Sequence, residues 1–378
     1  MREDSTTTRG TQPSAIDATA IKRVLIYRLG SLGDTVVALP SFHLVARTFP
    51  HARRLLLTNF PVHAKAPSAS AILGESGLVH GYLNYPVGTR SVRDLLRLWW
   101  SIRRFRPDLL VYLAKPRGED AVLRDERFFR ACGVRKIIGL PLGDRAINLQ
   151  RAEDRWESEA ARLARCVRDL GLIDLDDRSN WDLCLSPVEE ARAGAELVEL
   201  RGQPVIICGP GTKMQAKDWG AENWSDLMKR LAERFPNHGL VFVGAKEDRD
   251  ISDGLKANWP GRAVNLCGDL SPRETAAVME RAELFLGPDS GPMHFAAGAG
   301  VPCVIAFAAR TKPGIWFPQG KGHQVLYRRV DCAGCNLETC IEQKKKCLTS
   351  ITVDDMLTAA VNAWSERRDA HMSTKKHA

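Results

Sequence analysis

The sequence lacks any long apolar segment. No uninterrupted apolar run approaches the roughly 20 residues that a membrane-spanning helix needs. Residues 1–20 are polar, rich in Ser and Thr, and have no apolar core of the kind found in a signal peptide. We therefore expect a cytoplasmic protein with a disordered N-terminal arm over residues 1–20. Low-complexity segments and short-period repeats are also missing, which argues against a repeat array.

The dinucleotide-binding motif is missing as well. The turn after the first predicted strand carries Gly30 and Gly33, but their spacing is not the G-x-G-x-x-G of such a site. No acidic residue that could bind a ribose stands about twenty residues further on. A nicotinamide cofactor is therefore disfavoured.

Length and charge set broad limits. With 378 residues, of which 44% are hydrophobic, the chain is long enough for two domains and too long for one. A formal net charge of +9 favours an acidic partner, which by itself leaves nucleic acid, anionic lipid and nucleotide open. Because no recognition helix or base-stacking motif stands out, we expect no nucleic-acid partner.

The chain alternates predicted strands and helices in both halves, which is typical of parallel, doubly wound sheets. In the first half we predict strands at 23–27, 55–58, 109–113 and 136–139, and helices at 91–105, 119–132 and 157–170. In the second half we predict strands at 205–208, 240–243, 263–266 and 324–330, and helices at 224–235, 248–257 and 274–281.

An acidic stretch before the helix-start signal at Ser186 marks the junction between the halves. We therefore predict a first domain over 21–185 and a second over 186–351. A helix over 352–368 follows, with Asp355 placed to complete a capping box, and then a basic tail over 369–378. Such a terminal helix can cross back to the first domain, and the sequence leaves this open.

The segment 284–307 organises the second half. It reads as an apolar strand, a turn, a short helix and a second strand. Ser290 is predicted to cap the helix by accepting a bond from a first-turn amide, and Pro292 suits the first helical position. Free amides at a helix N-terminus favour an anion, so we expect a phosphate there, flanked by Asp289 and His294. The alternative is an ordinary turn with a half-buried histidine.

Two other turns at strand ends carry polar residues that packing does not require. In open α/β sheets ligands bind outside the carboxyl ends of the strands, so residues 30–34 and 210–217 should meet 289–294 at one cleft. Asp34 is either a general base or a residue that only complements a helix dipole. Lys213 and Lys217 are either phosphate ligands, with Thr212 as a donor, or part of a solvated loop.

These segments resemble glycosyltransferase family 9, the ADP-heptose:lipopolysaccharide heptosyltransferases. The most specific pieces are residues 28–34 (Arg-Leu-Gly-Ser-Leu-Gly-Asp) and 287–294 (Gly-Pro-Asp-Ser-Gly-Pro-Met-His), supported by residues 217–219 (Lys-Asp-Trp). The resemblance runs from about residue 23 to the end of the last helix. It implies an α/β protein of the GT-B fold, in which two Rossmann-like doubly wound domains face across a cleft. The acceptor would bind the first domain and the nucleotide-sugar the second.

The resemblance also implies roles for individual residues. Asp34 matches the catalytic base, Lys217 and Thr212 match phosphate contacts, and Glu247 matches a ribose contact. Four residues match the turn that binds the diphosphate and sugar: Asp289, Ser290, Gly291 and His294.

The implied reaction is inverting and independent of metal. Asp34 would deprotonate the acceptor hydroxyl, while Lys217 and the amides after Ser290 stabilise the departing ADP. No aspartate-x-aspartate motif lies near the expected diphosphate, which agrees with this mechanism. The alternatives are transfer of another sugar, such as N-acetylglucosamine, to a surface glycan, and a non-catalytic nucleotide-sugar-binding protein of the same fold.

The ten cysteines fall into two groups. Six scattered ones read as reduced packing residues: Cys132, Cys166, Cys184, Cys208, Cys267 and Cys303. The other four, Cys332, Cys335, Cys340 and Cys347, are close in sequence and could hold a structural Zn or Fe, although reduced thiols or a disulfide are alternatives.

Residues 90–106 form a predicted basic helix with Trp99 and Trp100. Such a helix can lie on an anionic membrane, or it can pack its apolar side on the sheet with its arginines in solvent. A lipid-anchored glycan acceptor would suit the positive face in either case. We therefore expect a protein peripheral to the cytoplasmic side of the inner membrane.

Overall fold

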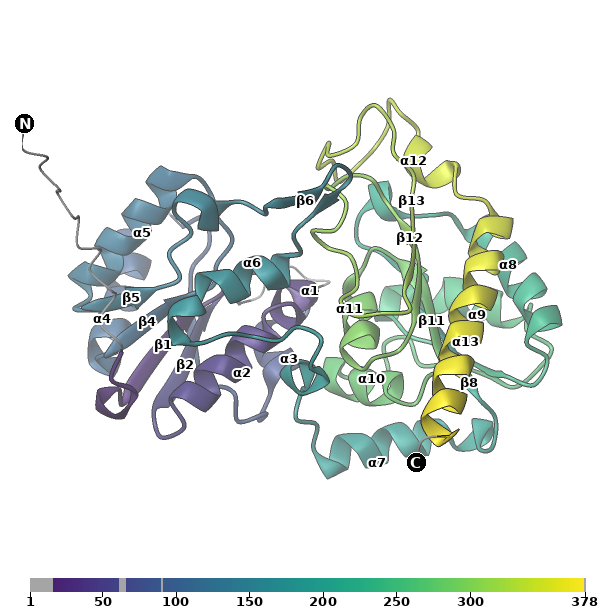
Figure 1. Cartoon of the computed structure of the whole chain (residues 1–378), viewed down its shortest axis with the longest axis horizontal. Helices are drawn as coiled ribbons and strands as arrows, with labels where there is room; N and C mark the ends of the chain where they lie inside the picture. The colour runs from purple at the N-terminus through teal and green to yellow at the C-terminus, as the bar shows by residue number, and fades with distance from the viewer. Residues whose placement is uncertain (1–15, 61–65, 90, 377–378) are drawn as a thin grey trace, which may run out of the picture.

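The computed structural model describes residues 16–60, 66–89 and 91–376. Most of the predicted N-terminal arm lies outside these residues, and Ala18–Ala20 form a 3-10 turn capped by Asp17. The described chain forms two α/β domains that stand side by side, as predicted (Figure 1).

The first domain is built on a five-stranded sheet in which every pairing is parallel. The strand order is β3-β2-β1-β4-β5, with β1 (Arg23–Tyr27), β2 (Arg53–Thr58), β3 (Tyr82–Asn84), β4 (Leu109–Tyr112) and β5 (Lys136–Ile138). Its helices are α1 (Leu32–Val36), α2 (Leu39–Thr48), α3 (Ala69–Leu73), α4 (Val92–Phe105), α5 (Glu119–Ala131) and α6 (Glu159–Cys166).

Successive side chains of β1 point to opposite faces of the sheet, so the core of this domain has one part on each face. Leu25 and Tyr27 belong to a buried cluster with apolar residues of α4 and α5. Val24 and Ile26 point the other way, into a cluster with α2, α3 and α6. Because helices cover both faces, the central strands are apolar throughout, as parallel strands require.

The second domain has a six-stranded parallel sheet of order β10-β9-β8-β11-β12-β13. Its strands are β8 (Val205–Cys208), β9 (Gly239–Phe242), β10 (Ala263–Asn265), β11 (Leu284–Pro288), β12 (Cys303–Phe307) and β13 (Gln324–Tyr327). Its helices are α7 (Pro187–Glu196), α8 (Ala221–Arg234), α9 (Arg249–Lys256), α10 (Pro272–Met279), α11 (Gly291–Gly298), α12 (Lys346–Thr349) and α13 (Val353–Lys376).

The predicted strands and helices are present, with shifted ends. The capping box predicted at Thr352 is formed with Asp355, and the helix that starts at Ser186 has a capping box with Glu189. The sequence analysis missed β3 and an antiparallel hairpin of β6 (Gln150–Ala152) and β7 (Arg155–Trp156). This hairpin displaces the start of the helix predicted at 157–170, whose last turn is a separate 3-10 turn.

Helix α13 packs on the second domain. Met356, Ala360 and Ala363 are buried in that domain's core, and Trp364 donates a hydrogen bond to Glu283. Crossing back to the first domain is therefore not observed for this helix. It also continues to Lys376, so residues 369–376 of the predicted basic tail extend the helix, and residues 377–378 lie outside the described part of the chain.

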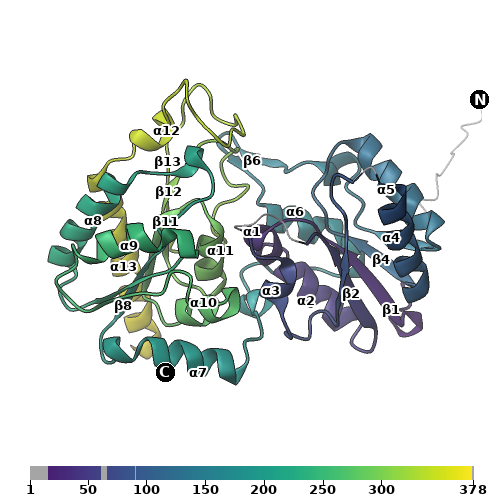
Figure 2. The same ribbon diagram turned by 180° about the vertical axis from the view of Figure 1, so that it is seen from behind.

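The β6–β7 hairpin connects the two domains on one side (Figures 1 and 2). The amide of Trp156 donates to the carbonyl of Pro313, and the amide of Glu159 donates to that of Ile315, each at 2.9 Å. The ammonium of Lys312 stacks on the Trp156 ring. The first domain is thus attached by backbone hydrogen bonds to the loop that follows β12.

Arg273 connects the domains at the opposite side, because its helix α10 packs against α3 and α7, which Figure 2 shows beside it. This nearly buried arginine of α10 donates to the carbonyls of Ile72 and Leu73 in the first domain, and to two carbonyls of the interdomain linker. Its guanidinium also pairs with Glu189 at 2.5 Å, which lowers the pKa of that carboxyl to about 2.

We predict that Arg273→Met destabilises the protein by about 3–5 kcal/mol, because it removes one partner of a largely buried ion pair and leaves carbonyls without donors. Urea unfolding measures this change. Arg281→Met, an exposed arginine beyond the end of the same helix, is the matched control and should cost about 0.5 kcal/mol or less. Equal destabilisation by both substitutions would contradict the interdomain role of Arg273.

Candidate active site

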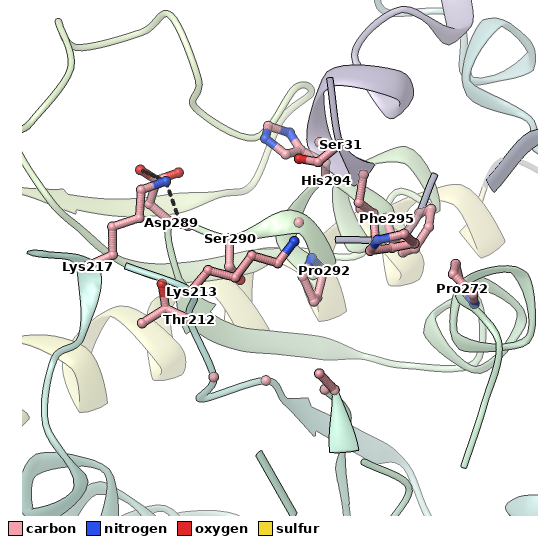
Figure 3. A pocket seen from close by; sticks show the side chains of 18 of the residues that line it. Ser31, Thr212, Lys213, Lys217, Pro272, Asp289, Ser290, Pro292, His294 and Phe295 are labelled. Atoms are coloured by element: carbon pink, nitrogen blue, oxygen red, sulfur yellow. Dashed lines mark hydrogen bonds and ion pairs between the residues drawn. The ribbon is translucent and has the colours of Figure 1, made fainter. Parts of the chain in front are cut away.

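A cavity of about 460 Å³ lies between the domains, and the three predicted turns converge on it (Figure 3). The lining includes every non-cysteine site residue predicted from the sequence: Asp34, Thr212, Lys213, Lys217, Glu247, Asp289, Ser290, Gly291 and His294. Residues as far apart as Asp34 and His294 meet there because each follows the carboxyl end of a parallel strand.

The turn after β11 differs in detail from the prediction. Ser290 occupies the N-cap position of α11, but its hydroxyl makes no capping bond. This Oγ is shielded from solvent, lines the cavity and has no hydrogen-bond partner among the described residues. Pro292 stands at the second helical position, after Gly291. A shielded polar atom without a partner costs free energy unless a ligand satisfies it.

Two lysines approach this turn from the loop after β8. Lys217 Nζ lies 2.9 Å from Asp289 Oδ2 and 3.0 Å from the Asp289 carbonyl oxygen, so it holds the turn as well as facing the cavity (Figure 3). Lys213 makes no ion pair within the described part of the chain and points into the cavity. Burial lowers the pKa of Lys213, and Lys217 acts in the same direction.

His294 lies on α11 and is buried. Burial lowers its pKa to about 4, so the ring is neutral at physiological pH. Its Cδ2 would lie 2.9 Å from a Cβ placed on Gly33, and Leu32 would be equally close to a Cβ on Gly291. The N-terminal ends of α1 and α11 therefore touch across the cleft only because both positions are glycine.

Asp34 is the third residue of α1, where it stabilises the start of the helix and also lines the cavity. Its Oδ2 accepts a 2.9 Å hydrogen bond from the Ser31 amide, which completes the helix start. Its Oδ1 faces Lys115 Nζ at 2.7 Å, and the carboxylate lines the cavity. Burial alone raises the pKa of Asp34, but the positive charges of Lys115 and Arg28 outweigh this and lower it to about 2.

A buried ion network supports the backbone of Asp34. The Arg28 guanidinium is 1% exposed and donates two hydrogen bonds to the Asp34 carbonyl and one to that of Leu113. It also contacts Glu159, which binds Arg162 through two further hydrogen bonds. Arg28 thus fixes the turn that carries Asp34 to the strands behind it.

Sequence reasoning missed Lys115 and Trp316. Lys115 follows β4, and its ammonium lies 4.1 Å from the centre of the Trp316 ring, which belongs to the second domain. The rule that strand ends line the cleft applies to Lys115 as it does to Asp34 and would have identified it. No comparable signal marks Trp316, which lies in an irregular loop.

The loop after β9 places Glu247 at the rim of the cavity, where it is exposed. Next to it, Asp248 accepts a bond from the Ala245 amide. A Cβ on Gly211 would lie 2.2 Å from the Asp248 carboxyl carbon, so Gly211 is needed for the loops after β8 and β9 to meet.

All ten cysteines are free, and five of the six scattered ones are buried, as expected of packing residues. Of the late four, Cys347 has its pKa raised by burial, and the other three thiols act in the same direction. Among the described residues, however, no group of three or more His, Cys, Asp or Glu side chains is arranged to hold a metal ion. The structure therefore does not assemble the Zn or Fe site, which stays a prediction.

Known proteins resemble this chain in sequence. A profile described as "Glycosyltransferase family 9 (heptosyltransferase)" matches residues 129–346. Lipopolysaccharide heptosyltransferase 1 of Pseudomonas aeruginosa is 30% identical over 336 residues, which cover 85% of this chain and 88% of that protein. Lipopolysaccharide core heptosyltransferase OpsX of Haemophilus influenzae is 23% identical, but the match covers only 34% of this chain and 36% of that protein.

Solved structures resemble it in fold. A family 9 glycosyl transferase from Veillonella parvula has a TM-score of 0.67 at 17% identity, covering 91% of this chain and 98% of that one. ADP-heptose lps heptosyltransferase II of Escherichia coli has a TM-score of 0.61 at 16% identity, covering 92% and 99%. E. coli heptosyltransferase WaaC with ADP-2-deoxy-2-fluoro heptose gives 0.56 at 15%, covering 89% and 98%. These similarities confirm the predicted GT-B architecture.

The low pKa of His294 leads to a prediction about stability. Because the pKa of His294 in the folded protein, about 4, lies below its ordinary value of 6.5, the unfolded chain binds more protons between these two pH values. Stability is therefore lost as the pH falls from 6.5 towards 4. Between about pH 7 and about pH 4.5, we expect the free energy of unfolding of His294→Asn to fall by on the order of 2 kcal/mol less than that of the wild type. Urea unfolding at the two pH values measures this difference. A difference between the two proteins that stays constant with pH would contradict a buried neutral ring.

Proposed function

The chain belongs to glycosyltransferase family 9, the heptosyltransferases, and from this premise we propose that it transfers a heptose from ADP-heptose to a lipopolysaccharide core acceptor with inversion. The observation that carries the proposal is the single cavity shared by Asp34 of the first domain and the α11 N-terminus of the second. The names of the similar proteins supply the donor and acceptor classes.

Asp34 is the proposed general base. In the reaction, a carboxylate oxygen takes the proton of an acceptor hydroxyl, whose oxygen attacks the anomeric carbon from the side of the first domain. The bond between that carbon and the diphosphate oxygen breaks, and ADP leaves with the bonding electrons. Arg28 supports this role, because it holds the backbone of Asp34 while leaving the carboxylate at the cavity.

The second domain is proposed to bind the donor and stabilise the leaving ADP. The Gly291 amide, the unpaired Ser290 hydroxyl and Lys213 are donors that face the cavity, and Lys217 adds positive charge beside Asp289. Donors fixed before reaction stabilise charge that develops on a diphosphate oxygen, as a metal ion would. Neutral His294 can contact the sugar without adding charge. Thr212 and Glu247 are proposed contacts to phosphate and ribose.

The acceptor is proposed to arrive on a membrane surface. No helix in the described ranges has the length and apolar composition needed to cross a membrane. Helix α4, however, exposes an apolar stripe at four-residue spacing: Val92 is 69% exposed, Leu96 58% and Trp100 56%. Such spacing places these side chains on one face.

Positive charge surrounds this stripe. Arg93, Arg97, Arg103 and Arg104 are all exposed on α4, which carries one acidic residue, Asp94. The opposite side of the helix packs on the sheet, and Trp99 donates to the Ala131 carbonyl of α5. One face of α4 therefore supports packing on the sheet, and the other supports contact with a membrane. An apolar stripe among arginines suits a bilayer with anionic headgroups on the cytoplasmic side of the inner membrane.

We expect Asp34→Asn to lower kcat by about 10²–10⁴-fold, because the amide cannot accept the acceptor proton. Transfer is measured as ADP released from ADP-heptose in the presence of heptose-free core acceptor. Calorimetric affinity for ADP-heptose should be nearly unchanged, which separates the base from donor binding. A variant that keeps its turnover would refute the assignment of Asp34.

We expect the triple substitution Val92→Ser, Leu96→Ser and Trp100→Ser to lower binding to anionic phospholipid vesicles by about tenfold or more, because it removes the apolar area that enters the bilayer. Co-sedimentation measures this. Leu172→Ser with Val188→Ser, which removes exposed apolar residues elsewhere, is the matched control and should bind like the wild type. Unchanged binding of the triple variant would exclude α4 as the membrane contact.

A further inference from the structure

Two cations flank Asp34, and they differ in how firmly they are held. Arg28 is 1% exposed and is fixed by hydrogen bonds to the carbonyls of Asp34 and Leu113. Lys115 is 46% exposed, and its ammonium contacts the Asp34 carboxylate and the face of the Trp316 ring. The half-exposed ammonium of Lys115 can exchange its contacts for water or another anion, whereas the Arg28 guanidinium is held inside the protein by three hydrogen bonds to carbonyls and cannot leave.

The position of Lys115 conflicts with the proposed role of Asp34. A base must have an oxygen within about 2.6–3.2 Å of the hydroxyl that it deprotonates. Oδ2 is engaged by the Ser31 amide at 2.9 Å, and Oδ1 faces Lys115 Nζ at 2.7 Å. An acceptor hydroxyl that approaches Oδ1 must therefore share or take the place of the ammonium.

We propose that Lys115 is the anion-binding residue of the acceptor site. An acceptor that carries a carboxylate or phosphate monoester beside its nucleophilic hydroxyl draws the ammonium from Asp34 onto that anion, and the hydroxyl takes the vacated place at Oδ1. This inference rests on the proposed function of Asp34. It adds a role for Lys115 in binding the anion of the acceptor, and it makes acceptor binding the event that frees the base.

The charges around Asp34 agree with such an exchange. Lys115 contributes the largest attraction that lowers the pKa of Asp34, so its departure leaves a stronger base. Arg28 stays in place, and Lys213 and His294 face the carboxylate from the second domain, with His294 neutral. The ammonium moves from one anion to another, so it does not become unpaired.

Trp316 fits the same exchange. Its ring offers the ammonium a cation–π surface in addition to the carboxylate, which keeps Lys115 at the cavity when the ion pair opens. Because the ring belongs to the second domain, the lysine remains in the cleft rather than moving into solvent. A purely structural role, in which Lys115 only joins the domains through this stack, is the competing explanation.

The substitution Lys115→Met separates the two explanations, because methionine keeps an apolar side chain on the Trp316 ring and loses the charge. Transfer from saturating ADP-heptose is measured with three forms of deacylated, heptose-free core oligosaccharide: untreated, carboxyl-methylated and phosphatase-treated. For the wild type we expect kcat/KM to fall roughly ten- to hundredfold with the form that lacks the anion that Lys115 binds. That form identifies whether the anion is a carboxylate or a phosphate.

Lys115→Met should show a similar loss with the untreated acceptor and no further loss when the anion is removed, while the KM for ADP-heptose stays unchanged. The acid limb of its kcat/KM profile should also lie at higher pH than in the wild type, because Asp34 has lost the cation that lowers its pKa. A variant that distinguishes the three acceptors as the wild type does would overturn the proposal.

Lys312→Met is the matched control, since this exposed lysine also stacks on a tryptophan but is not in contact with Asp34. It should retain wild-type kinetics with all three acceptors. If the wild type transfers no heptose to any of them, the proposed function fails, and calorimetric binding of the same oligosaccharides then tests Lys115 alone. Loss of anion-dependent binding in Lys115→Met supports the proposal, and equal binding by both proteins rejects it.

Discussion

The contact between two helix N-termini determines the geometry of this molecule. Helix α1 of the first domain and α11 of the second meet at their N-terminal parts. Gly33 lies against His294, and Gly291 lies against Leu32. Each helix end carries partial positive charge and free amides. Bringing both to one place creates a region suited to anions, and Asp34 is the carboxylate that the first helix supplies there. A side chain at either glycine would clash with these neighbours, and relieving the clash would move Asp34 away from the residues of the second domain that line the cavity.

The ionisable groups around the cavity divide into those that build it and those that face it. Arg28 and Lys217 bind backbone carbonyls and neighbouring carboxylates. Arg28 thereby holds the turn at Asp34, and Lys217 holds the turn at Asp289. Lys213 and Lys115 are held less tightly and are oriented towards the cavity. Burial lowers the pKa of His294 to about 4, so this ring adds no positive charge to the cavity at neutral pH. The same buried charges also support the fold, so part of the stability of this protein depends on its site.

Much of this arrangement could be predicted from the sequence because it follows from short-range rules. The alternation of apolar strands with capped helices predicted the two parallel sheets. Asp34, Lys217 and Asp289 each follow a strand, which predicted that they lie at the same edge. What could not be predicted depends on tertiary contacts. The hairpin at 150–156 forms against a loop 157 residues away in sequence, counted from Trp156 to Pro313, whose carbonyl accepts its hydrogen bond. Ser290 has the residue type of a helix cap, yet its hydroxyl has no hydrogen-bond partner within the part of the chain that the structure describes.

The two interdomain attachments restrict how the cleft can admit substrates. Arg273 fastens α10 to α3 at one side, and the backbone bonds of Trp156 and Glu159 fasten the hairpin at the other. A clamshell motion about the linker would break the hairpin bonds. A motion that preserves both attachments is a swivel about the line that joins them, which slides the first domain past the second. The position of Asp34 relative to the α11 N-terminus would then be set by torsion between the domains rather than by how widely they part.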